Sequence, residues 1–331
     1  MSNWQILLLG ILSILIIDFL IHLYYGWKSV PLFESCPPFR QDMSGIDVSA
    51  VTRIQIPSTN GVTLRGAIFA PRQEPCGVIL FLPEVQGCWQ TAAIHASGLT
   101  DAGLAVVAVD FRNQGESDAL AGYSPTHWAS EYELQDAQEA LSFIRRDSRL
   151  GHLPLGVHGV SRGACVALAL AAREPQIGAV LAQGPFSRDA LSLHFGRELL
   201  RSLCGPLARF VPDWHIRLTL QVTCFLSERR HGCRYLEISN SLHRLSGRSL
   251  MLTVGARDQY VPPRLVKQLA IQAAHIPEDV VWIVPSSKHN QERRVMGAEF
   301  DRRICEFFVQ SLSRSSPAPF GPQQTTRIHR R

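Results

Sequence analysis

The chain has 331 residues, of which 46% are hydrophobic and 18% are charged. This balance is typical of a globular core with an apolar excess and excludes a disordered chain. The formal net charge is +5, but residues 313–331 hold four of the 33 basic residues and none of the 28 acidic ones, which leaves 29 basic residues elsewhere. The body is therefore nearly neutral, and no nucleic-acid partner is expected.

Eight cysteines lie along the chain without a CxxC pair or a regular spacing. In a chain of this length the pattern excludes a disulfide framework and a cysteine zinc site. We expect reduced and mostly buried thiols, because free cysteine packs as a small hydrophobic residue. A reducing compartment is favoured.

The first predicted element is a single transmembrane helix over residues 4–27. The run reads WQILLLGILSILIIDFLIHLYYGW, and about 20 apolar residues suffice to cross a hydrocarbon core of about 30 Å. Its ends carry Trp4, Tyr24, Tyr25 and Trp27, and such rings favour the membrane interface. A cleaved signal peptide is the competing interpretation, but the leading MSNW has no basic side chain and no A-x-A-like cleavage site follows.

Two polar residues, Asp18 and His22, interrupt this run one helical turn apart. A charge at such a depth costs on the order of 3 kcal/mol. Either the two are tolerated near one end of the helix, or they pair with each other or with a neighbouring helix. Lys28 and Arg40 follow the run, so the positive-inside tendency places the large C-terminal part in the cytoplasm.

Residues 28–50 hold three prolines among mixed polar residues and are predicted to be a juxtamembrane linker. An α/β domain is predicted over residues 51–312. It opens with two alternating segments, 51–57 and 61–71, around the turn signal Thr59-Asn60-Gly61. This pattern indicates a β-hairpin.

Beyond the hairpin, short unbroken apolar runs alternate with segments of helical length. Runs buried on both faces and separated by helices indicate a parallel sheet. A helix predicted over 128–146 carries Leu134, Ala137, Leu141 and Ile144 on one face, the spacing that packs against a sheet. The fold class is therefore α/β, with a mostly parallel central sheet flanked by helices. The predicted buried strands are 77–82, 104–110, 154–160, 177–182, 249–255 and 280–285.

The interval 186–246 breaks this alternation. It has helical periodicity with several apolar stretches and lies between two predicted strands, which is the position of a lid or cap. The tail 313–331 is rich in Pro, Ser, Gln and Arg and is predicted to be disordered.

The most informative motif is GVSRG (159–163), a match to G-x-S-x-G. It follows a predicted buried strand and opens an Ala/Leu-rich helix, which is the context of a nucleophile elbow. Such a turn lifts the serine hydroxyl clear of the sheet, and the helix amino end behind it offers N–H groups to a developing oxyanion. Ser161 is therefore the candidate nucleophile, rather than a plain turn or cap residue.

A serine hydroxyl needs a base to accept its proton. Asp258 directly follows one predicted strand and His289 follows the next. The carboxyl ends of parallel strands meet at one edge of a sheet, so these side chains can converge there with Ser161. The chain order Ser…Asp…His also fits the elbow motif. Asp189, after another predicted strand, is an alternative source of the acid.

From roughly residue 51 to 312 the chain resembles the α/β-hydrolases, in the broad serine aminopeptidase-like and lipase-like group. The resemblance rests on GVSRG (159–163), DFRNQGES (110–117), GARDQYVPP (255–263) and SSKHN (286–290). It implies Ser161 as nucleophile, His289 as general base and then acid, and Asp258 as the residue that orients His289.

Two segments depart from the family's pattern. Many members carry His-Gly where this chain has LPEVQG (82–87), and that backbone builds half of the oxyanion hole. By position the donors here are the backbone N–H groups of Val85 and Arg162, and Glu84 adds a carboxylate nearby. Asn113 replaces the first glycine of the usual RGxGxS turn, which is tolerable because asparagine adopts left-handed conformations readily.

The resemblance implies a serine hydrolase that cleaves an ester, thioester or amide through an acyl-enzyme on Ser161. The apolar cap beside a membrane favours an acyl or lipid-like substrate. An acyltransferase with the same triad and a non-catalytic membrane protein that keeps the fold are the alternatives. His158 is expected to be a core residue rather than a catalyst. No P-loop, dinucleotide fingerprint, HExxH or zinc spacing appears, so neither a cofactor nor a metal is implied.

Overall fold

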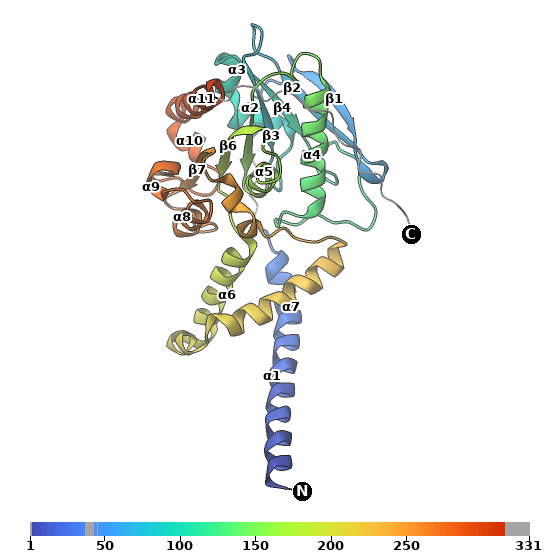
Figure 1. Cartoon of the computed structure of the whole chain (residues 1–331), viewed down its shortest axis with the longest axis vertical. Coiled ribbons are helices and arrows are strands. Elements are labelled where there is room, and N and C mark those ends of the chain that lie inside the picture. Colours follow the sequence, from blue (N-terminus) through green and yellow to red (C-terminus); the bar gives the residue numbers. More distant parts are fainter. Residues whose placement is uncertain (1, 37–42, 45, 315–331) are drawn as a thin grey trace.

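The computed structural model describes residues 2–36, 43–44 and 46–314 (Figure 1). Its centre is a sheet of eight strands in the order β1-β2-β4-β3-β5-β6-β7-β8. The predicted tail lies outside the described residues apart from Ser313 and Arg314, and so do residues 37–42 and 45 of the predicted linker. The strands are β1 (Thr52–Pro57), β2 (Thr63–Phe69), β3 (Gly77–Leu82), β4 (Leu104–Val109), β5 (Leu155–Val160), β6 (Ile177–Gln183), β7 (Ser249–Gly255) and β8 (Val281–Val284).

The strand pairing confirms the predicted α/β class. All pairs from β4 and β3 through to β8 are parallel. The hairpin β1–β2 is antiparallel and joins the sheet antiparallel to β4. Asn60 and Gly61 have φ of 60° and 72° in the turn between β1 and β2, the left-handed region that these two residue types adopt most easily.

Helices cover both faces of the sheet. Alternate residues of a strand point to opposite faces, so the apolar strands contribute to a separate core on each side. Leu80 of β3 packs in a core with α4 (Glu131–Arg146) and α5 (Arg162–Ala171), whereas Phe81 packs in a second core with α3 (Ser97–Asp101) and α11 (Ala298–Ser313). The remaining short elements of the body are η1 (Thr59–Gly61), η2 (Trp89–Thr91), α2 (Ala92–His95), α8 (Pro263–Gln272), α9 (Pro277–Val280) and α10 (Glu292–Met296).

Helix α4 begins three residues later than the predicted start at Trp128. Ser130 is its N-cap, and Ser130 and Glu133 form a capping box in which each side chain accepts the other's backbone N–H. This reciprocal arrangement satisfies two N–H groups that the first turn of a helix otherwise leaves without partners. The cap, rather than the apolar periodicity, fixes where the helix starts.

The N-terminal helix α1 (Asn3–Glu34) projects from the body (Figure 1). Among the described residues it is the one helix long and apolar enough to cross a membrane by length and composition. The helix continues past Trp27 to Glu34. Residues 28–34 are therefore helical, and the prediction that they belong to a linker is wrong. The added turns bury Phe33, whose ring stacks on Trp128 at 4.7 Å between centroids and whose carbonyl accepts the Trp128 indole N–H at 2.8 Å.

The segment 186–246 is helical. It contains α6 (Arg188–Cys204), η3 (Gly205–Phe210), α7 (Asp213–His231), η4 (Ile238–Asn240) and η5 (Leu242–Leu245). Helix α7 starts after Pro212 and ends at Gly232, which has left-handed φ and ψ of 63° and 34°, as is common after a helix. It crosses α1 beside Gly26, whose carbonyl accepts the Thr223 hydroxyl at 3.1 Å.

Candidate active site

Ser161 lies between β5 and α5 with φ of 51° and ψ of −113°. A non-glycine residue holds this conformation only where its surroundings enforce it, at a cost of about 1–3 kcal/mol. Its backbone N–H donates to the carbonyl of Gln183 on neighbouring β6 at 2.7 Å. The turn is therefore clamped to the sheet, with the serine at the carboxyl end of β5.

The two glycines of the motif allow this close packing. A Cβ on Gly159 would collide with the backbone of Gly163, and a Cβ on Gly163 would collide with the carbonyls of Leu82 and Pro83. Strand β5, helix α5 and the loop after β3 thus meet at van der Waals contact around Ser161. The G-x-S-x-G spacing is a steric requirement of this site.

The three side chains predicted to converge lie in a hydrogen-bonded series. Ser161 Oγ is 2.9 Å from His289 Nε2, and His289 Nδ1 is 2.7 Å from Asp258 Oδ2. All three residues are buried, with exposed fractions of 4–5%. Asp258 comes from the loop after β7 and His289 from the loop after β8, so both emerge at the sheet edge that presents Ser161.

Asp258 is fixed by its second oxygen. Oδ1 accepts the backbone N–H groups of Tyr260 at 2.9 Å and Val261 at 2.8 Å. Oδ2 is thereby left to face His289 Nδ1, which holds the imidazole with Nε2 towards Ser161. The carboxylate can orient the ring and stabilise an imidazolium.

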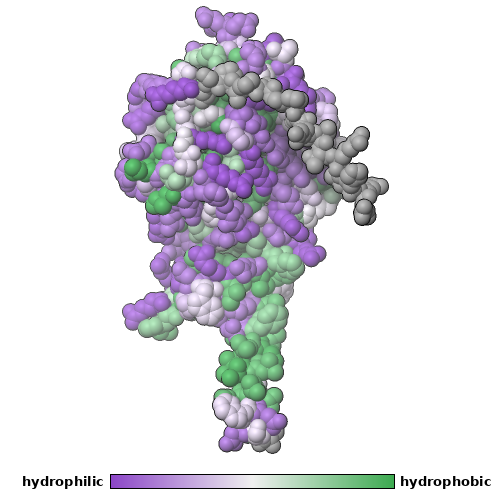
Figure 2. Space-filling model, viewed as in Figure 1, coloured by the Kyte–Doolittle hydropathy of each residue, from purple (hydrophilic) through white to green (hydrophobic). Residues whose placement is uncertain are grey.

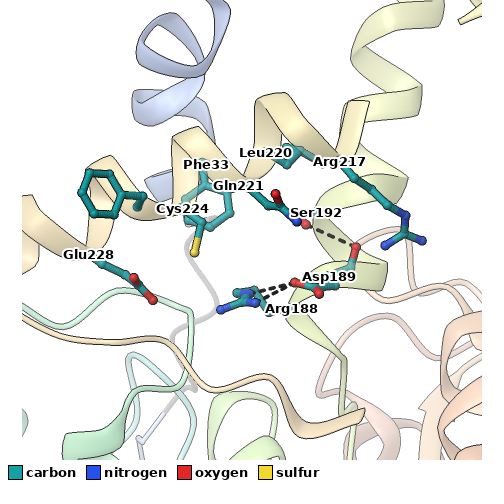
Figure 3. A pocket seen from close by; sticks show the side chains of 10 residues that line it. Phe33, Arg188, Asp189, Ser192, Arg217, Leu220, Gln221, Cys224 and Glu228 are labelled. Carbon is teal, nitrogen blue, oxygen red and sulfur yellow. Dashed lines mark hydrogen bonds and ion pairs between the residues drawn. The ribbon is translucent and has the colours of Figure 1, made fainter. Parts of the chain in front are cut away.

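Asp189, the alternative acid, lies elsewhere. It is in the first turn of α6, and its carboxylate pairs with Arg188 at 2.8 Å (Figure 3). Both line a pocket of about 250 Å³ between α6 and α7. The structure brings Asp258, not Asp189, to His289.

The loop after β3 carries Val85, one of the two predicted oxyanion donors. Gln114 connects this loop by hydrogen bonds to Arg162, the other predicted donor. Gln114 Nε2 donates to the carbonyl of Glu84 at 2.7 Å, and Gln114 Oε1 accepts from the fully buried Arg162 guanidinium. The Arg162 side chain therefore positions the loop. Arg162 is also the first residue of α5, so its backbone N–H directly follows Ser161.

Glu84 is 1% exposed, and its carboxyl lies against Gly87. Burial raises the pKa of Glu84 to about 7. Glu292, whose Oε2 accepts from Gln183 at 2.6 Å, also has its pKa raised to about 7 by burial. The carboxylate expected near the oxyanion segment is thus protonated over much of the range below neutrality.

His158 is fully buried, with its ring edge-on to Phe81 at 5.4 Å. Burial lowers the pKa of His158 to about 3 and that of nearby His95 to about 4. Both rings are uncharged near pH 7, and His289 is the histidine that reaches Ser161. His158 is a core residue, as expected.

A pocket of about 480 Å³ reaches Tyr260, which contacts His289, and Ser161, Asp258 and His289 themselves are not among its lining residues. Tyr260 and His127 line it, and the Tyr260 ring lies 5.1 Å from that of His289. The other apolar walls come from α1, α6 and α7, through Leu32, Phe33, Phe195, Leu199 and Leu220. The sequence did not single out these lining residues, because they come from segments far apart along the chain and follow no spacing.

Comparisons with known proteins agree with this fold. Residues 73–237, which include Ser161, match the sequence model of the family described as serine aminopeptidase, S33. No curated protein sequence matches the chain significantly. Among solved structures, an esterase of Pyrococcus furiosus is 19% identical with a TM-score of 0.59, covering 83% of this chain and 97% of the esterase.

Two other solved structures are similar. An α/β-hydrolase of a Penicillium species is 15% identical, with a TM-score of 0.59, over 80% of this chain and 99% of its own. A Butyrivibrio proteoclasticus protein solved with ferulic acid is 14% identical, with a TM-score of 0.56, over 78% and 99%. At these identities the likeness shows the fold. The chain is an enzyme of the α/β-hydrolase fold, and its residues 73–237 are similar to the serine aminopeptidase family.

Proposed function

We propose that this protein is a membrane-anchored serine hydrolase that cleaves acyl or lipid-like substrates through an acyl-enzyme on Ser161. The observation that carries the proposal is the hydrogen-bonded series from Ser161 Oγ through His289 to Asp258, at 2.9 and 2.7 Å. A nucleophile within reach of a base that a third group orients is the arrangement of acyl transfer.

In the first half-reaction, Ser161 Oγ attacks the substrate carbonyl carbon while His289 Nε2 takes the hydroxyl proton. The carbonyl oxygen becomes an oxyanion, and the backbone N–H groups of Val85 and Arg162 are the donors we propose for it. The intermediate collapses as His289 gives its proton to the leaving alcohol, thiol or amine. The acyl group remains as an ester on Ser161.

In the second half-reaction, water replaces the leaving group. His289 Nε2 takes a proton from the water as it attacks the acyl carbonyl, then returns that proton to Ser161 Oγ as the acid departs. Asp258 stays ionised and stabilises the imidazolium in both steps.

The pocket beside Tyr260 supports an acyl or lipid-like substrate. At about 480 Å³ it lies within the range of about 300–1,000 Å³ of small-molecule sites. Its apolar side chains fit an acyl chain, and Leu32 and Phe33 belong to the helix that we propose as the anchor. An acyl group on Ser161 would extend towards the membrane side of the domain.

The surface supports membrane attachment. Apolar residues cover the projecting length of α1, whereas the body beside it is largely hydrophilic on the face in view (Figure 2). The hairpin of α6 and α7, next to α1, exposes further large apolar side chains. These are Leu203, Leu207, Phe210, Trp214, Leu218 and Phe225, each at least 41% exposed.

Hydrolysis of p-nitrophenyl esters of graded chain length, by the full chain in detergent, tests the proposal. We expect turnover to favour medium or long acyl chains and to fall by at least about 10³-fold in Ser161→Ala. Equal turnover by wild type and Ser161→Ala would refute the mechanism. Turnover confined to acetate would refute the acyl-pocket assignment alone.

A further inference from the structure

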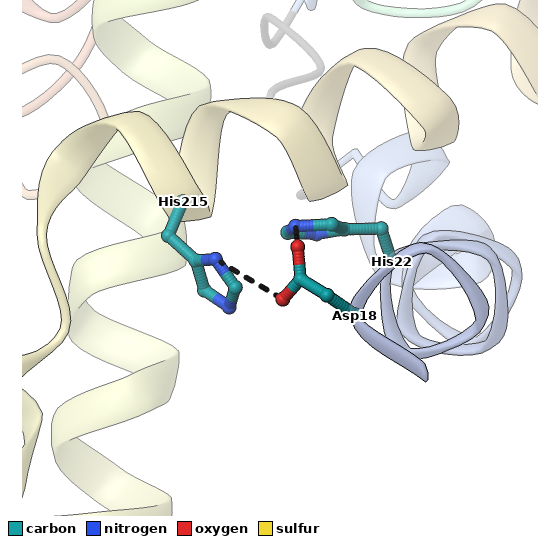
Figure 4. Close-up of side chains that lie close together, drawn as sticks. All are labelled: Asp18, His22 and His215. Carbon is teal, nitrogen blue, oxygen red and sulfur yellow. Dashed lines mark ion pairs between the residues drawn. The ribbon is translucent and has the colours of Figure 1, made fainter. Parts of the chain in front are cut away.

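Three side chains with metal-binding atoms meet where α1 crosses α7. Asp18 and His22 come from α1 and His215 from α7 (Figure 4). Asp18 Oδ2 is 3.5 Å from His22 Nε2, and Asp18 Oδ1 is 3.9 Å from His215 Nδ1. One donor atom from each residue lies within 4.8 Å of the other two.

His22 is held with one nitrogen aimed into this cluster. Its Nδ1 is 2.8 Å from the Thr219 hydroxyl, and its side chain is 6% exposed. Its buried Nε2 makes no hydrogen bond among the described residues. A histidine with one nitrogen fixed by a hydrogen bond and the other facing further donor atoms has the arrangement of a metal ligand.

We propose that Asp18, His22 and His215 bind a zinc ion that joins the N-terminal helix to the cap segment. Two imidazole nitrogens and a carboxylate oxygen are donors that zinc prefers. Tetrahedral zinc at about 2.0–2.1 Å from each ligand needs donors about 3.3–3.4 Å apart. Two donor separations are 3.5 and 3.9 Å and the third is at most 4.8 Å, so side-chain rotations that bring the donors together are needed to reach these values.

A fourth coordination position remains for water. Asp18 and His215 are 39% and 30% exposed, so one side of the cluster is open.

The site would fix the relative position of two pocket walls. The same two helices supply Phe33 and Leu220, which line the pocket of about 480 Å³. Zinc at one end of their contact would act with the Thr223–Gly26 hydrogen bond, further along the two helices, to hold α7 on α1.

Zinc binding to the full chain tests this inference without reference to catalysis. Protein purified in detergent without a histidine tag is stripped with EDTA, then titrated with zinc against a chromophoric chelator, with bound metal counted by mass spectrometry. Asp18→Asn and His215→Ala each remove one ligand, and His243→Ala, at an exposed histidine outside the cluster, is the matched control.

We expect one zinc per wild-type chain, the same for His243→Ala, and at least tenfold weaker binding for Asp18→Asn and His215→Ala. Magnesium, which prefers an all-oxygen site, should not compete. Zinc should also slow amide exchange in residues 213–231 of wild type but not of His215→Ala. Because His215 is 30% exposed, we expect this variant to keep the wild-type melting temperature without zinc. Equal affinity in all four proteins, or no binding below about 100 μM, overturns the inference.

Discussion

Ser161 and its neighbours show how backbone strain and burial combine at single residues. The strained turn at φ of 51° persists because the glycines at 159 and 163 let strand, helix and loop close around it. Glu84 is the second unusual residue, a buried carboxyl in the segment we propose for the oxyanion hole. Its protonation state decides whether that segment carries a negative charge.

Glu84→Gln should change the pH dependence of stability. The folded-state pKa of about 7 exceeds the ordinary value of 4.5, so between these pH values the folded protein binds more protons than the unfolded chain. Wild-type stability attributable to Glu84 is then greatest below pH 4.5 and falls as pH rises towards 7. The free energy of unfolding of Glu84→Gln relative to wild type should rise by on the order of 3 kcal/mol from pH 4.5 to 8.

Chemical denaturation in detergent across this pH range measures the difference. Glu74→Gln, at an exposed carboxyl, is the matched control and should run parallel to wild type. Parallel curves for wild type and Glu84→Gln would show that Glu84 ionises normally in the folded protein.

The sequence identified the residues that the structure brings together, because the elbow motif and the strand ends constrain them strongly. Ser161, Asp258 and His289 each follow a short apolar run that was predicted to be a strand and is one, in β5, β7 and β8. Neither the burial of Glu84 nor the contact from Arg162 to Gln114 could be predicted in this way. Both depend on loops whose paths are set by tertiary packing and not by local periodicity.

At the scale of elements, α1 shows tertiary contacts overriding a local signal. Pro31 and the polar residues after Trp27 predict the end of a helix, since proline removes a hydrogen bond within it. The helix nevertheless runs to Glu34, because its last turns pack Phe33 against Trp128 and bury Val30. No pattern within residues 28–34 predicts the contact with Trp128, which lies about a hundred positions away in the sequence.

Gly26→Leu should separate α7 from α1. A Cβ at Gly26 would lie 2.6 Å from Val222 Cγ1, so a larger side chain cannot be placed without moving α7. We expect a loss of about 1–3 kcal/mol of stability and weaker discrimination between long and short acyl esters. Thermal unfolding in detergent and the ester series measure the two effects.

Gly10→Leu provides the matched control on the same helix, because nothing lies within 4 Å of a Cβ at Gly10. It should leave both the melting temperature and the chain-length preference unchanged. Similar behaviour of the two variants would mean that the contact between α1 and α7 does not shape the pocket.

At the scale of the whole molecule, one apolar helix and a helical hairpin with exposed apolar side chains lie on the same side of a largely hydrophilic body (Figures 1 and 2). The pocket is lined by α1, α6 and α7 together with Tyr260, which contacts His289. The α/β class and the helical nature of residues 186–246 were predictable because each rests on periodicity. The meeting of Asp18 and His22 with His215 was not, since nearly two hundred residues separate the two segments.

The proposed orientation places the body in the cytoplasm. The thiol of Cys76 is exposed on the body, so a membrane-impermeant maleimide reports which side it occupies. In sealed cells we expect labelling to appear only after permeabilisation and to diminish in Cys76→Ser. Labelling of intact cells would place the body on the outer side.

The proposed mechanism depends most directly on Ser161 being an activated nucleophile. A fluorophosphonate added to the full chain in detergent, followed by intact and peptide mass spectrometry, tests this in one measurement. We predict one adduct per chain, located on Ser161. The Ser161→Ala variant should form no adduct while keeping the melting temperature of wild type. A folded wild-type protein that forms no adduct, or a Ser161→Ala protein that is labelled equally, would contradict the proposed mechanism.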